Sequence, residues 1–211
     1  MNKTIKKQVQ KISNTKILLI RNFIDEENLK KYFRRKIDNT KIPSFIFLGD
    51  LTKRKGPLVL LKSFKKIAKY QKLMLHIVGE GPLRDTLEKY IQKSNLGNQV
   101  ILHGFLSNPY EILSKSDVMV LPSYSEGTPR AAMEALFLGV PIVLRDVDSN
   151  KDLVDKEIRN GELFKNNYEL ADMMLKTINV SRNRKSRENL LPIEFRRTSI
   201  FKKYKKVFKV K

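Results

Sequence analysis

The chain has 211 residues, of which 41% are hydrophobic and 31% are charged, a length and composition that fit one sizeable soluble α/β domain with appendages. It contains no cysteine, which excludes disulfides and thiolate metal sites and fits a reducing cytoplasm. Its 43 Lys and Arg outnumber its 22 Asp and Glu, and the formal charge of +21 favours phosphate-bearing partners such as a nucleotide, a nucleic acid or an anionic lipid.

Residues 1–15 form a basic segment that lacks the apolar stretch of a secretory signal. No apolar run in the chain approaches the roughly 20 residues that a membrane-spanning helix needs. The next segment, KILLIRNFI at 16–24, predicts either a strand or the stretch by which the chain leads into a folded domain. A helix is predicted over residues 26–37, with Asp25 as its N-cap.

From residue 43 to residue 178, short apolar runs alternate with segments of helical periodicity. The pattern predicts an α/β fold, a Rossmann-like parallel sheet with helices on both faces, in a domain that spans residues 16–178. Ligands of such sheets bind at the carboxyl ends of the strands, where the glycine-rich turns of this sequence fall. The predicted strands are 45–49, 72–79, 99–105, 118–123, 141–144 and 161–164, and the predicted helices are 57–70, 83–94, 110–116, 129–139 and 168–178.

Residues 179–211 form a strongly basic C-terminal segment. Three roles remain open for it: docking on a neighbouring domain, lying on an anionic membrane surface, or binding nucleic acid. The last is the least expected, because the chain has no recognisable nucleic-acid-binding module. A terminal helix is predicted from the roughly helical spacing of five apolar residues, Phe195, Ile200, Phe201, Tyr204 and Phe208.

The segment SYSEGTPRAAMEALFLGVPIV at 123–143 is the most informative part of the sequence. It follows an apolar strand and opens a helix, for which Thr128 is the predicted N-cap and Pro129 the first helical residue. The unpaired amides of that helix end, preceded by the flexible Gly127, predict an anion site at the carboxyl end of a strand. Arg130 supports this interpretation, because a purely structural helix favours an acidic residue in its first turn.

Two carboxylates, Glu126 and Glu134, stand eight positions apart in this segment. Glu134 has mostly apolar neighbours on the predicted helix, so its carboxylate needs hydrogen-bond donors, and the vicinal hydroxyls of a ribose are suitable ones. The alternatives are an ordinary ion pair between Glu134 and Arg130 and, for Glu126, a solvated loop position.

Two further glycine turns follow predicted strands. In GDLTKRKGP at 49–57, Gly49 would let the main chain approach a diphosphate, and Arg54 or Lys55 would neutralise it, unless the turn is only an exposed basic loop. The turn VGEGP at 78–82 has the same placement. Neither turn is a Walker A motif, because the required Gly-Lys-Ser/Thr is absent. His76 and His103 are predicted to be structural, although His103 stands close enough to the strand end to reach the same cleft.

These turns, in this order, resemble the C-terminal, donor-binding domain of retaining glycosyltransferases of family 4, which have the GT-B fold. The resemblance covers roughly residues 17–178. Its most specific element is Glu-x7-Glu inside a Ser-x-x-Glu-Gly…Glu-Ala…Gly-x-Pro frame. It also rests on an ordered set of turns, Gly49…Lys55-Gly56, Gly79-Glu80-Gly81-Pro82, His103-Gly104-Phe105 and Pro122-Ser123.

By position, the resemblance implies that Glu126 faces the transferred sugar as the catalytic residue and that Glu134 holds the ribose hydroxyls. Lys55 would bind the donor diphosphate, and Phe105 would border the nucleobase. No metal or other cofactor is expected, since basic residues and the helix dipole stabilise the leaving diphosphate in this family. The remaining donor-binding residues are expected to be Gly49, Arg54, Gly79, Glu80, Gly127, Thr128, Pro129 and Arg130.

One position departs from the family, which often has Arg where this sequence has Asp50, so phosphate binding at this turn depends on Arg54 or on Asp50 pointing away. The resemblance implies transfer of a sugar from a nucleotide diphosphate sugar, in first place a UDP-sugar, to a glycan or lipid of the cell envelope. The lack of cysteine and the basic C-terminal helix together lead us to expect a cytoplasmic location with peripheral contact to the inner face of the membrane.

The acceptor-binding domain of such enzymes has no counterpart in the sequence before residue 16. A partner chain that carries the acceptor domain is therefore an expectation, and so is donor binding with little transfer by this chain alone. The alternative is a non-catalytic donor-binding fragment or subunit, and nucleic-acid binding is less expected.

Overall fold

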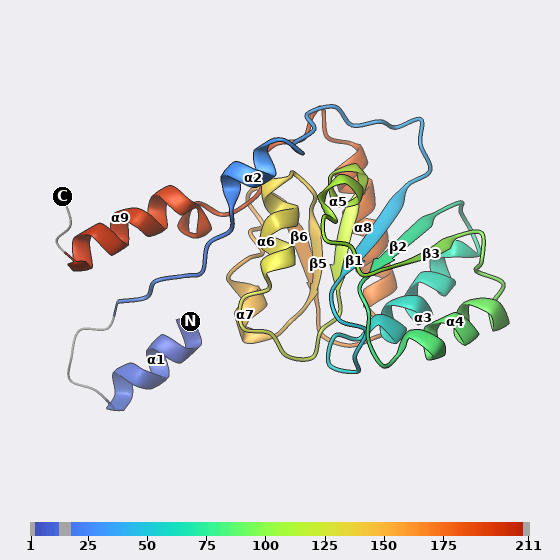
Figure 1. Cartoon of the computed structure of the whole chain (residues 1–211), viewed down its shortest axis with the longest axis horizontal. Coiled ribbons are helices and arrows are strands. Elements are labelled where there is room, and N and C mark those ends of the chain that lie inside the picture. The colour runs from blue at the N-terminus through green and yellow to red at the C-terminus, as the bar shows by residue number, and fades with distance from the viewer. Residues whose placement is uncertain (1–2, 13–17, 209–211) are drawn as a thin grey trace.

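The computed structural model describes residues 3–12 and 18–208, most of which fold around one parallel sheet (Figure 1). Six strands within these residues form the sheet: β1 (Ser44–Leu48), β2 (Met74–Val78), β3 (Val100–Gly104), β4 (Val118–Leu121), β5 (Ile142–Arg145) and β6 (Gly161–Phe164). Their order is β3-β2-β1-β4-β5-β6, and neighbouring strands all pair in parallel. The order reverses between β1 and β4, so the carboxyl ends of these two strands flank the switch point at which such sheets bind ligands.

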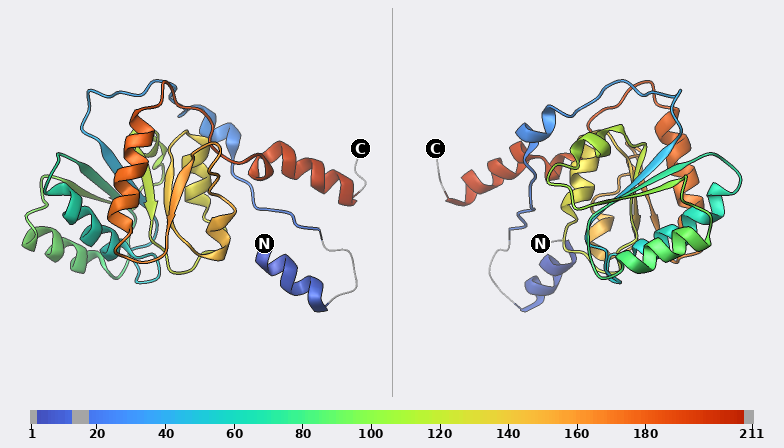
Figure 2. Two further views of the ribbon diagram at one scale, coloured as in Figure 1. Left: turned by 180° about the vertical axis from the view of Figure 1, so that it is seen from behind. Right: turned by 45° about the vertical axis from the view of Figure 1, so that its right-hand side comes forward.

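Helices cover both faces of the sheet, which confirms the predicted Rossmann-like α/β fold. On one face α3 and α8 pack side by side, with α4 next to α3, whereas α6 covers β4 and β5 on the other face (Figures 1 and 2). The helices between and after the strands are α3 (Pro57–Ala68), α4 (Arg84–Lys93), α5 (Tyr110–Lys115), α6 (Arg130–Phe137), α7 (Asp148–Lys151) and α8 (Leu170–Arg182).

The central strands are apolar along their whole length because the sheet is covered on both sides. Every residue of β1, β4 and β5 is buried, whereas the edge strand β3 is partly exposed at four of its five positions. This is the continuous apolar pattern from which the parallel sheet was predicted. The predicted strands agree with the observed ones to within two residues at either end.

Helix α6, which carries the second glutamate of the Glu-x7-Glu motif, begins one residue later than predicted. Pro129 is the N-cap, so Thr128 lies outside the helix, and no side chain caps the first amides. At the other end the Gly139 amide donates to Leu136 O and the Val140 amide donates to Ala135 O, an arrangement typical of a Schellman motif. Gly139 has a φ of 76°, which a residue with a side chain adopts less readily.

The segment before β1 differs from the prediction at two points. Residues 18–25 contain no strand and cross the surface as extended chain, with Arg21 and Ile24 buried; residues 16–17 lie outside the described part of the chain. Helix α2 (Glu26–Lys30) begins as expected, with the Asp25 carboxylate accepting a hydrogen bond from the Asn28 amide. It ends seven residues earlier than predicted. The amides that follow it bond three residues back, which tightens the last turn and stops the helix.

The first part of the C-terminal segment packs on the core, and the segment then extends away from the core as α9. Helix α8 continues to Arg182, beyond the expected boundary at residue 178, and the buried Arg187 donates to the carbonyls of Ser114 and Ser116. A 3-10 turn (Ile193–Phe195) precedes α9 (Arg197–Phe208), which confirms the predicted helix except that Phe195 stands before it; residues 209–211 lie outside the described part.

Helix α9 projects from the body of the molecule, with Ile200 as its buried residue (Figures 1 and 2). Helix α1 (Lys3–Ile12), formed by most of the basic N-terminal segment, lies on the same side and contacts α7. Within residues 3–12 and 18–208, no helix combines the length and the apolar character that crossing a bilayer requires.

Candidate active site

The loops that follow β1, β2 and β3 pack against one another at the carboxyl ends of these strands. The Gly49 amide donates to the Val78 carbonyl at 3.1 Å, and the Gly79 amide donates to the Gly104 carbonyl at 2.8 Å. A Cβ atom added at Gly79 would lie 2.0 Å from the Gly49 carbonyl oxygen, so no side chain fits between these two stretches of backbone. The turns therefore form a continuous floor of main chain that a ligand can approach closely.

A cavity of about 410 Å³ opens above this floor and reaches the first half of α6. We call it the strand-end pocket, and its volume lies within the range of roughly 300–1,000 Å³ that is usual for small-molecule sites. Half of the predicted site residues line it: Gly49, Gly79, Glu80, Phe105, Arg130 and Glu134. The Phe105 side chain is 76% exposed, so its ring is available to stack on a ligand.

Glu134 is the buried acid of this pocket. It is 8% exposed, and its Oε1 atom lies 3.3 Å from the Tyr110 hydroxyl, which donates to it, and 3.7 Å from the guanidinium of Arg130. Burial raises the pKa of Glu134, while Arg130 and the Tyr110 hydroxyl lower it by a smaller amount. The ion pair with Arg130 that was considered as an alternative does exist, but it is long and Arg130 is mostly exposed. The carboxylate thus retains the capacity to accept further hydrogen bonds from a ligand.

Glu126 has a different environment, because basic side chains of the preceding β1–α3 loop surround it. Lys55 Nζ lies 2.7 Å from Glu126 Oε1, and Arg54 lies 3.9 Å from the same oxygen. The Glu126 and Lys55 side chains are 8% and 16% exposed, so this ion pair is largely shielded from water. The structure thus pairs Glu126 with Lys55, a contact that the resemblance did not specify, and neither side chain lines the strand-end pocket.

The loops before α3 and α6 are also joined by two hydrogen bonds, one from the Arg54 guanidinium and one between main-chain groups. Arg54 donates to the Ser125 carbonyl at 2.9 Å, and the Tyr124 amide donates to the Arg54 carbonyl at 2.8 Å. A Cβ atom on Gly56 would lie 2.8 Å from the Pro122 carbonyl oxygen. The position of Glu126 is therefore determined by both loops together.

The Gly127–Pro129 turn leads from this loop into α6 and does not line the strand-end pocket. Nothing lies within 4 Å of the position that a Cβ on Gly127 would take, so the turn is open on that side. Pro129 has no amide proton, so the amides that this helix end can offer to a ligand come from Arg130 and Ala131, and from Gly127 and Thr128 in the turn before it.

Asp50 and Glu80 modify the charge of the pocket. Asp50, the departure from the family pattern, lines the pocket next to Gly49, while Arg54 bonds to Ser125 and does not line it. The Glu80 carboxylate forms an ion pair with Arg84. The turn after β1 therefore contributes main chain to this pocket and no cationic side chain.

His103 lies on β3 and faces His76 on β2, with the His76 Nδ1 and the His103 Nε2 atoms 3.0 Å apart. Burial lowers the pKa of both imidazoles, and neither residue lines the strand-end pocket. The pair bridges two adjacent strands, in agreement with the predicted structural role.

Two residues of the site were not singled out from the sequence. Tyr110 begins α5 and reaches Glu134 across 24 positions of sequence, and its ring packs on that of Tyr32 at 5.5 Å. Arg145, at the end of β5, donates to the Pro122 carbonyl at 3.2 Å and lies 4.2 Å from the centre of the Tyr124 ring. Arg145 stands directly after the predicted strand 141–144 and Tyr110 at the start of the predicted helix 110–116, and these positions were the available signal.

Within the described residues, no group of three His, Cys, Asp or Glu side chains is arranged to hold a metal ion. The strand-end pocket offers main chain, the cation Arg130, the buried carboxylate of Glu134 and the carboxylates of Asp50 and Glu80, and the ion pair of Lys55 with Glu126 lies outside its lining. This set of groups can bind an anionic ligand that also carries hydroxyl groups.

Known proteins resemble this chain in sequence and in fold. Residues 28–192 match the family described as "Glycosyl transferases group 1". The chain is 34% identical to the UDP-Gal:alpha-D-GlcNAc-diphosphoundecaprenol alpha-1,3-galactosyltransferase of Escherichia coli over 67% of its own length and 40% of that protein. It is 28% identical to the poly(ribitol-phosphate) alpha-N-acetylglucosaminyltransferase of Staphylococcus aureus over 91% of its length and 39% of that protein.

Among solved structures, the chain resembles Staphylococcus aureus TarM in complex with Fondaparinux, alpha-GlcNAc-glycerol and UDP. The TM-score is 0.78 and the identity 23%, and the match covers 100% of this chain and 43% of TarM, which shows a shared fold. The chain thus spans less than half the length of these relatives. Because the family match covers most of the sequence, the chain belongs to the group 1 glycosyl transferases.

Proposed function

We propose that this chain is the donor-binding half of a retaining glycosyltransferase of family 4 that uses a UDP-sugar. The observation that carries the proposal is the buried Glu134 carboxylate in a pocket whose floor is glycine main chain at the carboxyl ends of the strands. A ribose supplies the hydroxyl donors that such a carboxylate requires, and the main-chain floor accommodates a bulky diphosphate.

The strand-end pocket suits the nucleoside part of the donor. Glu134 would accept hydrogen bonds from the ribose hydroxyls, and the exposed Phe105 ring would stack on the base. Arg130 lines the same pocket and would neutralise the diphosphate, close to the main chain of Gly49 and Gly79. The carboxylate of Glu80, paired with Arg84, would border this part of the donor.

The transferred sugar would lie towards Glu126 and the open turn formed by Gly127, Thr128 and Pro129. In the structure Lys55 is bound to Glu126 at 2.7 Å, so a donor diphosphate would compete with Glu126 for this cation. Release of Glu126 towards the sugar would follow from that competition. Arg54 lies 3.9 Å from Glu126 and donates to the Ser125 carbonyl. It would place a second positive charge close to the diphosphate.

We propose that transfer needs no metal ion. The leaving diphosphate would be stabilised by Lys55, Arg130 and the amides at the beginning of α6, which supply fixed positive charge where negative charge develops. Donor binding that is unchanged by a strong chelator supports this part of the proposal, and binding that a chelator abolishes contradicts it.

The names of the relatives support the choice of a UDP-sugar as donor and of a retaining reaction. One relative is named for UDP-Gal, TarM was solved with UDP, and both curated relatives are named for alpha-linked transfer to acceptors of the cell-envelope type. An alpha-linked product is what a retaining enzyme forms from the alpha-linked sugar of UDP-galactose. We therefore expect an acceptor that is a glycan or a lipid-linked glycan.

A second candidate is a donor-binding fragment or subunit that requires an acceptor-binding partner chain. The observation in its favour is that the chain spans less than half of its relatives. Donor binding without sugar transfer by the isolated chain supports the need for a partner, and normal turnover by the isolated chain contradicts it.

We further propose a cytoplasmic protein that contacts the inner membrane surface through α9. This helix carries a cluster of lysines and no acid, and it exposes Phe201, Tyr204, Val207 and Phe208. Co-sedimentation with vesicles rich in anionic lipid, and its loss in a Lys205→Glu, Lys206→Glu variant, is the expected result. Binding to DNA that is tighter than binding to UDP would instead favour the nucleic-acid alternative.

A thermal-shift panel of UDP, GDP and ADP with their sugars tests the donor assignment. UDP and UDP-sugars are expected to raise the unfolding temperature, since a ligand at 100 times its Kd adds about 2.7 kcal/mol of stability. The Glu134→Ala variant is expected to lose the shift, and Glu157→Ala, which removes an exposed acid outside the pocket, is expected to keep it. An undiminished shift in Glu134→Ala would remove the basis of the proposal.

A further inference from the structure

Tyr110 lies behind Glu134 and outside the lining of the strand-end pocket. Pro109, its neighbour in sequence, lines the pocket, and Tyr110 begins α5 directly after it. The Tyr110 hydroxyl lies 3.3 Å from Glu134 Oε1 and donates to it, because an ionised carboxylate can only accept. Tyr110 therefore contacts the carboxylate that we assign to the ribose without lining the pocket itself.

Two side chains hold the Tyr110 ring in place. The ring of Tyr32, which follows α2 in the chain, packs on it with the ring centres 5.5 Å apart. The Asn108 side chain accepts a hydrogen bond from the Tyr110 amide at 3.3 Å and donates another to the Tyr32 hydroxyl. The Tyr110 hydroxyl is thus kept at one position relative to Glu134.

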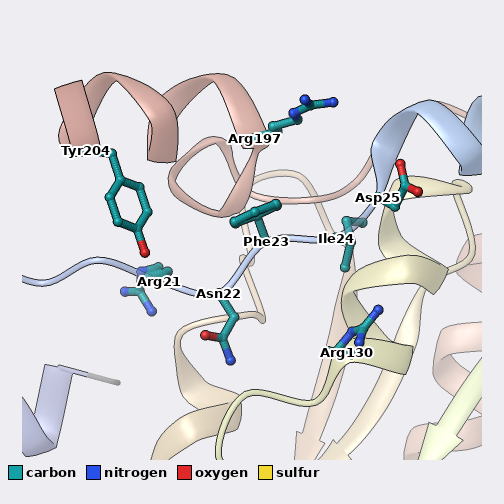
Figure 3. A pocket seen from close by; sticks show the side chains of 8 residues that line it. All are labelled: Arg21, Asn22, Phe23, Ile24, Asp25, Arg130, Arg197 and Tyr204. Carbon is teal, nitrogen blue, oxygen red and sulfur yellow. The ribbon is translucent and has the colours of Figure 1, made fainter. Parts of the chain in front are cut away.

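Both polar partners of Glu134 approach the same oxygen. The Arg130 guanidinium lies 3.7 Å from Oε1, the atom that the Tyr110 hydroxyl also contacts. Figure 3 shows Arg130 projecting from the first turn of α6, below the stretch of Ile24 and Asp25 that leads into α2. Among the residues that the structure describes, no hydrogen bond is formed to Glu134 Oε2. The second oxygen therefore remains for a ligand.

A donor on one oxygen matters because the terminal torsion of a glutamate has a broad range. A ligand that meets a freely rotating carboxylate must fix its orientation on binding, which reduces the affinity. We propose that Tyr110 is a positioning residue of the donor site, whose hydroxyl holds Glu134 Oε1 so that Oε2 accepts from the ribose. This inference rests on the proposed function, since it takes the ribose as the ligand of Glu134.

The test is titration calorimetry of UDP with the full chain and its variants. Tyr110→Phe keeps the ring against Tyr32 and removes the hydroxyl, and is expected to weaken UDP binding by about 3–10-fold, the usual effect of losing one hydrogen bond. Tyr90→Phe is the matched control, because it removes a hydroxyl from a half-buried tyrosine of α4 outside the pocket lining. It is expected to leave the UDP affinity unchanged, and the unfolding temperature of both variants reports whether the fold is retained.

A double-variant cycle separates positioning from a general structural role. A positioning residue acts only through the group that it orients, so Tyr110→Phe should cause no further loss of UDP affinity when Glu134 is already alanine. Titration of Glu134→Ala and of Tyr110→Phe, Glu134→Ala at high UDP concentration measures this. A hydroxyl that only supported the local fold would reduce the affinity by the same factor in both backgrounds.

The pH dependence gives a second readout. The Tyr110 hydroxyl favours the ionised carboxylate, so its removal should raise the pKa of Glu134 further and move the rise of UDP affinity to higher pH. Tyr90→Phe should keep the wild-type profile, and Glu134→Gln corrects for ionisation of UDP. The charged groups around Tyr110 and Glu134 stay the same in Tyr110→Phe: Arg130 on α6, Asp25 at the start of α2, Lys31 beside the Tyr32 ring, and Asp50 and Glu80 in the pocket lining.

Two results would overturn the inference: wild-type UDP affinity and pH profile in Tyr110→Phe, or equal losses from Tyr110→Phe with and without the Glu134 side chain. Failure of the donor proposal would look different, because UDP would not bind the wild-type chain or would bind Glu134→Ala equally well. That outcome would remove the ribose from Glu134 and the role of Tyr110 with it.

Discussion

The two glutamates of the Glu-x7-Glu motif lie in regions of opposite character. Glu126 belongs to a loop region in which Lys55, Arg54 and hydrogen-bonded main chain surround its carboxylate. Glu134 belongs to a helix whose other residues are mostly buried and apolar, and one tyrosine hydroxyl and one distant arginine are its polar partners. The two glutamates therefore differ in their surroundings: Glu126 is part of an ion pair in the loop, whereas burial in the helix raises the pKa of Glu134.

The difference shows how a single motif can perform two tasks. A lysine that neutralises one anion can pair instead with a more strongly charged anion, such as a diphosphate, when that ligand arrives. A buried carboxylate with few internal donors gains hydrogen bonds when a ligand provides them. We expect the first glutamate to respond to the transferred sugar and the second to the nucleoside.

The largest expected effect comes from replacing the two glutamates separately. Glu134→Gln should weaken UDP binding by roughly 10–150-fold, the equivalent of losing about 1.5–3 kcal/mol in hydrogen bonds to a charged group. Glu126→Gln should leave UDP binding nearly unchanged and reduce the additional affinity for a UDP-sugar over UDP. Titration calorimetry with UDP and UDP-sugars checks both. Equal losses in the two variants would mean that the regions do not divide the donor between them.

The next effect concerns stability. Lys55→Met removes the cation 2.7 Å from a Glu126 carboxylate that is 8% exposed, so the free energy of unfolding should fall by about 1–3 kcal/mol. The double variant Lys55→Met, Glu126→Gln should recover part of that loss, because no unpaired charge is left. Urea denaturation of the single and double variants measures the coupling. An additive result would show that the two side chains do not interact.

A smaller effect is expected when the affinity for UDP is measured as a function of pH. Burial raises the pKa of Glu134, so the carboxyl contributes stability in acidic solution that is lost as pH rises through the raised value. Since ribose hydroxyls bond best to the ionised form, UDP affinity should increase over the same pH interval. Measuring the Kd for UDP between about pH 5 and pH 8 tests this, with Glu134→Gln as the reference for ionisation of the nucleotide itself. Identical pH profiles for the two proteins would exclude a contribution from Glu134.

The smallest effect is expected at the mouth of the strand-end pocket. Phe105→Ala should weaken UDP binding by about 2–10-fold through the loss of aromatic stacking. Its side chain is 76% exposed, so stability should change little. Tyr70→Ala, which removes an aromatic ring that is 88% exposed and far from the pocket lining, is the matched control. Unchanged UDP affinity in Phe105→Ala would place the base elsewhere.

Much of the fold could be predicted from the sequence because its signals are local. Continuous apolar runs such as 45–49 and 118–123 become buried central strands, and glycines at their ends mark the turns. The extent of α2 could not be predicted in the same way. The pattern after Lys30 is still helical, but the chain turns there to cross towards β1.

The site was predictable in part for the same reason. Gly49, Gly79, Phe105 and Glu134 each follow or face a strand end, and the topology brings them to one pocket. The partners of the glutamates could not be predicted, because they depend on packing between distant segments. Lys55 meets Glu126 across 71 positions and Tyr110 meets Glu134 across 24, and no local pattern encodes either contact.

The contact between the backbones at Gly49 and Gly79 limits how this protein can diversify. With a Cβ on Gly79 only 2.0 Å from a carbonyl oxygen, neither evolution nor an engineer can reshape the floor of the site one residue at a time. New preferences for a different base or sugar must instead arise at the rim, at freely replaceable positions such as Phe105. The floor would thus be inherited as a fixed unit while specificity drifts around it.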